Sequence, residues 1–212
     1  MNKLFAQIDV FRTNVTEGIS EDVLNKKEKE LGINLPEGMR DFYMKFGNDK
    51  EVMGSNWKFY SIENVRIQND ALVFGCKPED TATIGIMMQH LLSPYQAISY
   101  YSMPGKKWFS DGFAFPEPFF FHIACWQLVN SMASVAKTII SWEDLQELAN
   151  GKLSFFSNEK KYIKGNRIVS VYGDGILGSY FKEDGELYLG TRNGDEVLEE
   201  LEEELGLDLD WL

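Results

Sequence analysis

Residues 19–49 read ISEDVLNKKEKELGINLPEGMRDFYMKFGND, and this stretch predicts two helices joined by a tight corner. Ser20 is a favourable N-cap for the first helix, and the two acidic residues after it suit the positive end of the helix dipole. Gly32 stands where a residue in the left-handed conformation commonly ends a helix. Pro36 then opens the second helix, because proline lacks the N–H group that a first helical turn leaves unbonded.

The second helix carries its apolar residues on one stripe at helical spacing. These residues are Leu35, Met39, Phe42, Tyr43 and Phe46. We therefore expect this helix to bury a largely aromatic face. The first helix is expected to be a thinner cover, with Val23, Leu24 and Leu31 facing inward and a lysine- and glutamate-rich face outward.

This pair of helices resembles the opening signature of the SUKH superfamily. The resemblance rests on an acidic, lysine-rich helix ending in Leu31-Gly32, then Leu35-Pro36, then an aromatic helix ending in Phe46-Gly47-Asn48. Later segments are similar to core strands of the family, namely FYSIENV at 59–65, LVFG at 72–75 and AISYY at 97–101, with Trp108 after the last. Many members carry a polar triplet like Glu-Asn-Gln after the second of these strands, where this chain has Lys77-Pro78-Glu79-Asp80.

The resemblance covers about residues 19–150 and implies both a fold and a function. The implied fold is α+β, a mainly antiparallel, curved β-sheet flanked by helices. Most bacterial members are immunity proteins that bind a secreted toxin, often a nuclease, and occlude its active site without turnover. The yeast member regulates cell-wall synthesis, which leaves open a second role as a regulatory scaffold that binds a signalling partner.

Periodicity and turn residues predict short strands and helices along the rest of the chain. A short N-terminal helix is expected to pack through Leu4, Ile8, Phe11 and Val15. Strands are expected at 57–62, 70–76, 96–102 and 108–115, with a helical turn at 64–68. Residues 81–88 are ambiguous, although Gly85 argues against a stable helix there.

Residues 119–137 are apolar on nearly every face, so we expect one central helix buried on all sides. Ser141 begins a capping-box helix that runs to about residue 150. Asp-Gly and Asn-Gly turns then separate short alternating runs, which predicts a β-meander and, after it, an acidic helix. We expect residues 1–212 to form one domain, and a soft boundary near 151–160 is left open.

The net charge of −12 is concentrated at one end of the sequence. Of the 33 acidic residues, nine lie between 195 and 212, and the remaining 24 face 21 Lys and Arg residues. The stripe of Val197, Leu198, Leu201 and Leu205 predicts a docked helix whose outer face pairs like charges at i, i+4. A solvating helix explains this pattern as well as a steering surface for a basic partner does.

On the steering interpretation, a basic toxin domain is the expected partner, and direct nucleic-acid binding is disfavoured because phosphates are repelled. We call residues 195–212 the acidic tail. The predicted partner-binding residues are the carboxylates on its outward face. They are Glu196, Glu199, Glu200, Glu203, Glu204, Asp208 and Asp210.

No catalytic residue, cofactor or metal site is predicted. Residues 173–178, GDGILG, have dinucleotide-loop spacing, but a strand is expected after them where that motif needs a helix, so we interpret them as a turn. His122 lies in the most apolar stretch, which indicates a core histidine. The alternative is an enzyme that uses Glu79, Asp80 or His90.

The remaining predictions concern compartment. Cys76 and Cys125 are each embedded in apolar sequence, which favours buried thiols over a disulfide. The opening residues MNKLFAQIDVF include Asp9 and lack the apolar core of a signal peptide. No stretch approaches the ~18 apolar residues of a membrane span. We therefore expect a cytoplasmic protein, and the sequence leaves its oligomeric state open.

Overall fold

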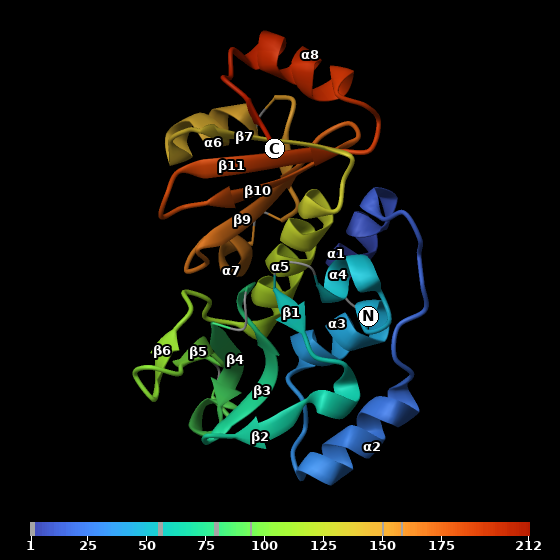
Figure 1. Ribbon diagram of the computed structural model, residues 1–212, viewed down its shortest axis with the longest axis vertical. Coiled ribbons are helices and arrows are strands. Elements are labelled where there is room, and N and C mark those ends of the chain that lie inside the picture. The colour runs from blue at the N-terminus through green and yellow to red at the C-terminus, as the bar shows by residue number, and fades with distance from the viewer. Residues whose placement is uncertain (1–2, 55–56, 79–80, 94, 150, 158) are drawn as a thin grey trace.

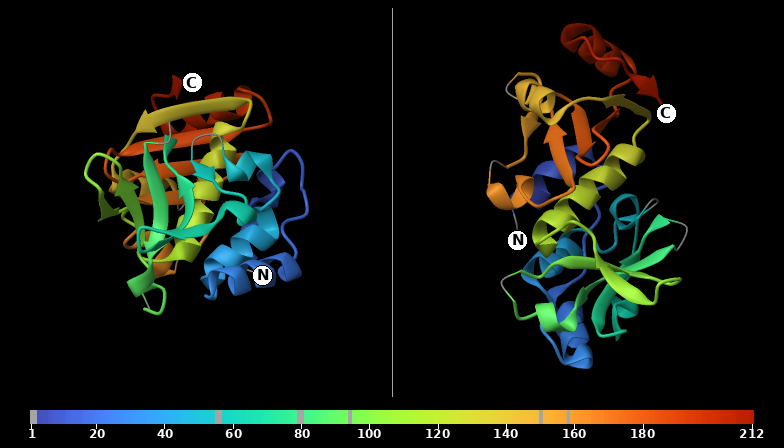
Figure 2. Two further views of the ribbon diagram at one scale, coloured as in Figure 1. Left: turned by 60° about the horizontal axis from the view of Figure 1, so that its bottom comes forward. Right: turned by 90° about the vertical axis from the view of Figure 1, so that its left-hand side faces the viewer.

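The computed structural model describes residues 3–54, 57–78, 81–93, 95–149, 151–157 and 159–212. Within these residues the chain forms two antiparallel sheets of six strands each, with the long helix α5 (Pro116–Asn130) between them. In Figure 2 this yellow-green helix lies between the green first sheet and the orange second sheet. The expected α+β class and antiparallel strand pairing are confirmed. The structure has a second antiparallel sheet in addition to the one predicted sheet flanked by helices.

The two signature helices form as predicted. Helix α2 (Glu21–Leu31) has Ser20 as its N-cap and ends at Gly32, whose φ is 68°. Helix α3 (Glu37–Phe46) begins directly after Pro36, whose carbonyl oxygen accepts the N–H groups of the first turn. All five residues of the predicted stripe on α3 are buried.

One inward-facing residue of α2 was wrongly predicted. Val23 is 40% exposed, whereas Lys27 is buried. The Lys27 ammonium donates to the carbonyl oxygen of Glu63 at 2.9 Å and to Glu30 at 2.8 Å. A lysine can occupy this inward position because its alkyl stem is apolar and its charge meets two acceptors.

The first sheet follows the strand order β1-β3-β4-β5-β6, and β2 also pairs with β3. Its strands are β1 (Lys58–Phe59), β2 (Arg66–Gln68), β3 (Ala71–Cys76), β4 (Ala82–Met87), β5 (Ile98–Ser102) and β6 (Lys107–Ser110). The smaller helical elements here are α4 (Lys50–Met53), η2 (Ile62–Asn64) and η4 (Met88–His90).

The predicted helical turn at 64–68 is wrong. Only η2 is helical, and β2 forms a hairpin with β3 through Asn69 and Asp70, whose φ angles are 51° and 58°. A two-residue turn with positive φ at both positions matches the twist of a hairpin, and Asn and Asp tolerate that conformation. The Asn-Asp pair lacks the glycine that usually marks such a turn in a sequence.

Helix α5 is the predicted core helix, but it ends at Asn130 instead of continuing to residue 137. Residues Ser134–Ile139 form the strand β7, in which Ser134, Ala136 and Thr138 are buried. The apolar sequence is continuous because the chain passes directly from a buried helix to a buried strand. Phe119 and Phe120 of α5 pack on Phe74 of the first sheet, with ring centroids 5.8 and 5.1 Å apart.

The second sheet follows the strand order β12-β7-β11-β10-β9-β8. Its other strands are β8 (Ser154–Phe155), β9 (Ile168–Tyr172), β10 (Ile176–Phe181), β11 (Glu186–Thr191) and β12 (Asp210–Trp211). Strands β9 to β11 are the predicted meander. One face packs on α5, where a Cβ on Gly190 would lie 3.1 Å from the Val129 carbonyl oxygen, so a larger residue would push the helix and the strand apart.

Helices α6 (Trp142–Leu148) and α8 (Glu196–Leu205) lie over the other face of the second sheet (Figure 1). The capping box of Ser141 and Asp144 forms as predicted at α6. The remaining elements are α1 (Lys3–Gln7), η1 (Ile8–Phe11) and α7 (Lys160–Ile163). Phe5 of α1 packs beside Phe121 of α5, whereas Val15 is 63% exposed and does not join the predicted N-terminal stripe.

His122 is a core histidine, as its sequence context indicated. It is 2% exposed, and its Nε2 lies 2.8 Å from the Tyr162 carbonyl oxygen. Because a carbonyl oxygen only accepts, Nε2 carries the proton and Nδ1 accepts from the Ser170 hydroxyl at 2.9 Å. Burial lowers the pKa of His122 to about 4.

This lowered pKa predicts a loss of stability in acid. The unfolded chain binds a proton on His122 near its ordinary pKa of about 6.5, and the folded chain does so only near pH 4. The stabilising contribution is therefore present above pH 6.5 and is lost as the pH falls to 4, at a cost of about 3 kcal/mol. We expect the free energy of unfolding in urea to be higher for wild type than for His122→Gln above pH 6.5. This advantage of wild type should shrink by about 3 kcal/mol as the pH falls to 4. Parallel pH curves for wild type and His122→Gln would contradict the prediction.

Candidate partner-binding surface

Helix α8 presents the predicted acidic face outward. Leu198 and Leu201 are buried against the second sheet, and Val197 and Leu205 pack partly against it, so the predicted apolar stripe is confirmed. The seven carboxylates proposed from the sequence are all exposed, five on α8 and two after Gly206. They are Glu196, Glu199, Glu200, Glu203, Glu204, Asp208 and Asp210.

Two further acidic residues of this tail have structural roles. Asp195 accepts a hydrogen bond from the Ser134 hydroxyl of β7. Glu202 accepts the Leu209 N–H at 2.9 Å and thereby holds the turn that returns the chain to the sheet. The last strand, β12, then pairs with β7. The tail is therefore a docked part of the fold.

A groove runs along one side of α8 and has a volume of about 300 Å³. We call it the α8 groove. Its lining residues are Lys152, Asp174, Ile176, Asn193, Val197, Glu200, Leu201 and Glu204. Lys152 and Glu204 form an ion pair of 2.5 Å, but both side chains are about half exposed, so the pair contributes little to stability.

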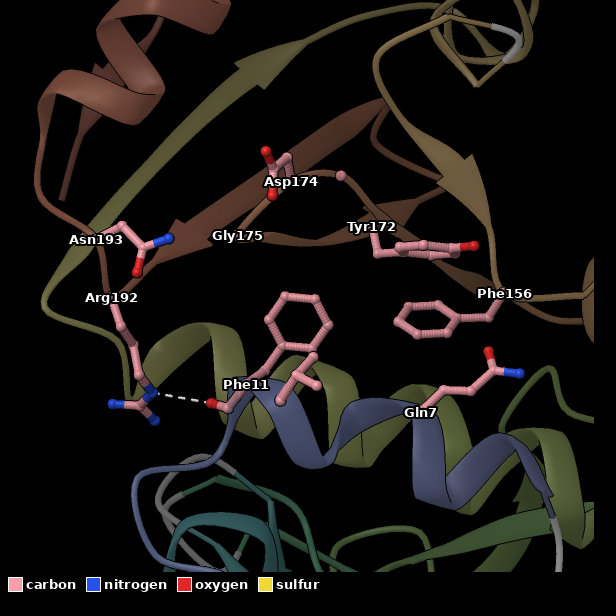
Figure 3. A pocket seen from close by; sticks show the side chains of 10 residues that line it. Gln7, Phe11, Phe156, Tyr172, Asp174, Gly175, Arg192 and Asn193 are labelled. Atoms are coloured by element: carbon pink, nitrogen blue, oxygen red, sulfur yellow. Dashed lines mark hydrogen bonds between the residues drawn. The ribbon is translucent and has the colours of Figure 1, made fainter.

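A second, larger cavity adjoins the α8 groove and shares Asp174 and Asn193 with it. We call this cavity of about 520 Å³ the aromatic hollow (Figure 3). Its lining residues are Gln7, Val10, Phe11, Phe156, Tyr172, Gly173, Asp174, Gly175, Arg192 and Asn193. Figure 3 shows the rings of Phe11, Phe156 and Tyr172 bordering one space, with Asp174 and Asn193 on its rim.

Arg192 joins the N-terminal segment to the second sheet beside the hollow. Its Nε donates to the Phe11 carbonyl oxygen at 2.8 Å, and its guanidinium also reaches Ser131 at 3.0 Å and Glu51 at 3.3 Å. These contacts fix η1 against the end of β11. The hollow is thus built between two parts of the chain that are distant in sequence.

The turn between β9 and β10 supplies the acidic rim of the hollow. The Gly173 N–H donates to the Ile176 carbonyl oxygen at 2.9 Å, and β10 begins at Ile176, so residues 173–175 form the turn, 176–178 begin the strand, and the strand expected in place of a helix is present. Gly175 has a φ of 72°, and a Cβ there would lie 2.2 Å from Nδ2 of Asn193. Glycine is therefore required both for the backbone conformation and for the approach of Asn193.

Sequence reasoning missed the aromatic hollow, because three separate segments form it and only the turn at 173–178 was visible in advance. Of the residues considered for catalysis, Glu79 and Asp80 lie outside the described residues, and His90 ends η4 beside the first sheet. Across the described residues, no three His, Cys, Asp or Glu side chains are grouped as metal ligands. Cys76 and Cys125 are buried free thiols. No helix in the described ranges has the length and apolar character needed to cross a membrane.

A family model described as the SMI1/KNR4 family (SUKH-1) matches residues 18–124, which is half of the chain. The chain belongs to the SMI1/KNR4 family. No match to it was found among curated proteins or among solved structures. The SMI1/KNR4 segment spans α2, the first sheet and the first part of α5. Helix α8, the α8 groove and the aromatic hollow all lie outside that segment.

Proposed function

We propose that this SMI1/KNR4 family protein is an immunity protein that binds a basic toxin domain stoichiometrically and occludes its active site. Family membership supports a protein-binding role. The observation that carries the proposal is the outer face of α8, where Glu196 and Glu200, Glu199 and Glu203, and Glu200 and Glu204 stand at i, i+4.

This arrangement of carboxylates does not serve stability. Each like-charge pair at i, i+4 costs a few tenths of a kcal/mol. Among the described residues, Lys152 is the cation within ion-pair distance of these five glutamates, and it reaches only Glu204. A surface of one sign raises the rate at which an oppositely charged partner associates. The α8 face therefore suits capture of a basic domain.

Capture followed by a rescue assay tests the proposal. The full chain should retain a basic domain from native lysate, and that domain should be toxic when expressed alone and harmless when this protein is co-expressed. Purified together, the two should form a complex of fixed stoichiometry in which the activity of the toxin is lost. Retention of signalling proteins without toxicity would instead support the regulatory scaffold.

Neutralising α8 should slow association with that toxin domain without unfolding the protein. Replacing Glu196, Glu199, Glu200, Glu203 and Glu204 by Gln is expected to lower the association rate at low salt about tenfold, because long-range attraction is lost. High salt screens the same charges, so the difference should disappear there. Stopped-flow or surface-binding kinetics over a salt series measure both effects.

The chain offers a matched control for this prediction. Glu143 and Glu147 are exposed at the same spacing on α6, over the same face of the second sheet. The pair Glu200→Gln and Glu204→Gln should slow association more than the pair Glu143→Gln and Glu147→Gln. Equal association rates for the two double variants would assign α8 a solvating role only.

A further inference from the structure

We propose that the aromatic hollow is an anchor site for an arginine side chain presented by a basic protein partner. The identity of that partner as a toxin domain rests on the function proposed above, whereas the chemistry of the site rests on the hollow itself. The hollow shares no residue with the segment matched to the SMI1/KNR4 family. It thus lies entirely outside the family segment.

The inner wall of the hollow suits a flat cation. Phe11 and Phe156 are 6% and 8% exposed, so they form its buried part, and Tyr172 is 37% exposed at its mouth. The rings of Phe156 and Tyr172 lie 4.6 Å apart between centroids. A guanidinium stacks on aromatic faces and is more weakly hydrated than an ammonium. Val10, which is 80% exposed, offers apolar surface to the alkyl stem of the same side chain.

The rim of the hollow supplies a negative charge that can pair with the positive charge of an arginine. Asp174 is exposed there, and a carboxylate can accept two parallel N–H groups of a guanidinium. Its turn is held from both sides, because Thr191 donates to the Gly175 carbonyl oxygen at 2.9 Å and Gly173 bonds to Ile176. The backbone that carries Asp174 is therefore fixed before a ligand arrives, which lowers the cost of binding.

Arg192 also lines the hollow, but its positive charge does not neutralise Asp174. The Arg192 guanidinium is directed toward Phe11, Ser131 and Glu51, and Figure 3 shows it hydrogen-bonded to Phe11 on the side of the hollow away from the Asp174 carboxylate. The adjoining α8 groove adds the carboxylates of Glu200 and Glu204. An anionic ligand would be repelled by these groups, and an apolar one would leave Asp174 without a partner. An arginine would pair with Asp174 in the hollow, and basic residues beside it on the partner would face the carboxylates of the α8 groove.

Binding of short peptides to the full chain tests the site without any toxin. The probe is acetyl-Gly-Arg-Gly-amide, followed by amide chemical shifts in the protein, with the lysine and leucine analogues as comparison. We expect shifts centred on Phe11, Tyr172, Asp174 and Asn193, and affinity about threefold lower for the lysine peptide and about tenfold lower for the leucine peptide. Equal shifts for all three peptides, or shifts elsewhere only, would overturn the proposal.

Two variants sharpen the test. Asp174→Asn should weaken the arginine probe about fivefold, because the charged acceptor is lost while the shape of the side chain is kept. Asp184→Asn is the matched control, since Asp184-Gly185 forms the equivalent turn at the other end of the same sheet, with a Gly185 φ of 68°. Tyr172→Leu should also weaken binding about fivefold through loss of the ring. Equal affinities for Asp174→Asn and Asp184→Asn would overturn the proposal.

The two proposals can fail separately. A captured toxin domain that binds Asp174→Asn as tightly as Asp184→Asn would remove the anchor site from that complex and leave the immunity function standing. Selective binding of the arginine probe, together with no toxin in the capture and rescue assay, would retain the anchor site and reject the immunity function.

Discussion

A chain that stops at Gly194 should lose about 5 kcal/mol or more of its free energy of unfolding. The lost segment buries Leu198, Leu201 and Leu209 against the second sheet, with exposures of 0%, 4% and 7%. Each buried leucine contributes roughly 1.5–3 kcal/mol relative to an exposed one. Removal also takes β12 from β7, where Trp211 pairs with Ala136, and so leaves the backbone groups of β7 without a neighbour on that side.

Denaturant unfolding followed by circular dichroism measures this loss, and amide hydrogen exchange locates it in β7 and β11. The control is the variant with five glutamines on α8, which removes charge but retains the buried leucines and should unfold at a similar denaturant concentration. An unchanged midpoint for the shortened chain would contradict the prediction. Because truncation disturbs the sheet, only the glutamine variants test the charge of α8.

Replacing Asp49 by Ala should destabilise the protein by about 3–5 kcal/mol, the usual cost of removing one partner of a buried ion pair. Asp49 is 2% exposed and accepts from Arg12 Nε at 2.6 Å, and the Arg12 side chain is fully buried. Asp49 also caps α4, where it accepts the N–H groups of Glu51 at 2.8 Å and Val52 at 3.3 Å. The substitution removes a helix cap and leaves a buried guanidinium with less compensation.

Urea unfolding of three variants separates these two effects. Asp49→Asn retains an oxygen that can cap the helix and removes only the charge, so it should cost less than Asp49→Ala. Combining Arg12→Met with Asp49→Ala should also cost less than Asp49→Ala alone, because no buried charge is then left uncompensated. A loss below about 1 kcal/mol for Asp49→Ala would show that this pair is not a major source of stability.

Local sequence patterns predicted much of the fold. The caps at Gly32 and Ser141 and the Asp-Gly turns of the meander are short-range signals, and each appears in the structure. Ser20 takes the N-cap position of α2, but its side chain makes no capping hydrogen bond. Strand β7 was missed because its residues that face α6 and α8 are small or polar, Ser134, Ala136 and Thr138, so no hydrophobic alternation marks it. Its pairing with β11 and β12 is a long-range contact that no local pattern shows.

The acidic face of α8 was visible in the sequence because helical spacing places its glutamates together. The aromatic hollow was not visible, since Phe11, Phe156 and Tyr172 meet only once the second sheet has packed against the N-terminal segment. The single-domain organisation of residues 1–212 stays a prediction. Its support is α5, which packs on Phe74 of the first sheet and on β9 to β11 of the second, and unfolding monitored separately in each sheet would test it.

The position of α5 also sets an order in which structure can form during synthesis. The strands of the first sheet pair with near neighbours in sequence, and all of them precede α5. The β9–β10 hairpin can form once its two strands are made, but β7 must wait for β11, because Ser134 pairs with Thr191. Long-range pairings of this kind form slowly. Until β11 has been made, Val129 of α5 lacks the strand that carries Gly190 over it, and this apolar surface is where nascent chains would associate with one another.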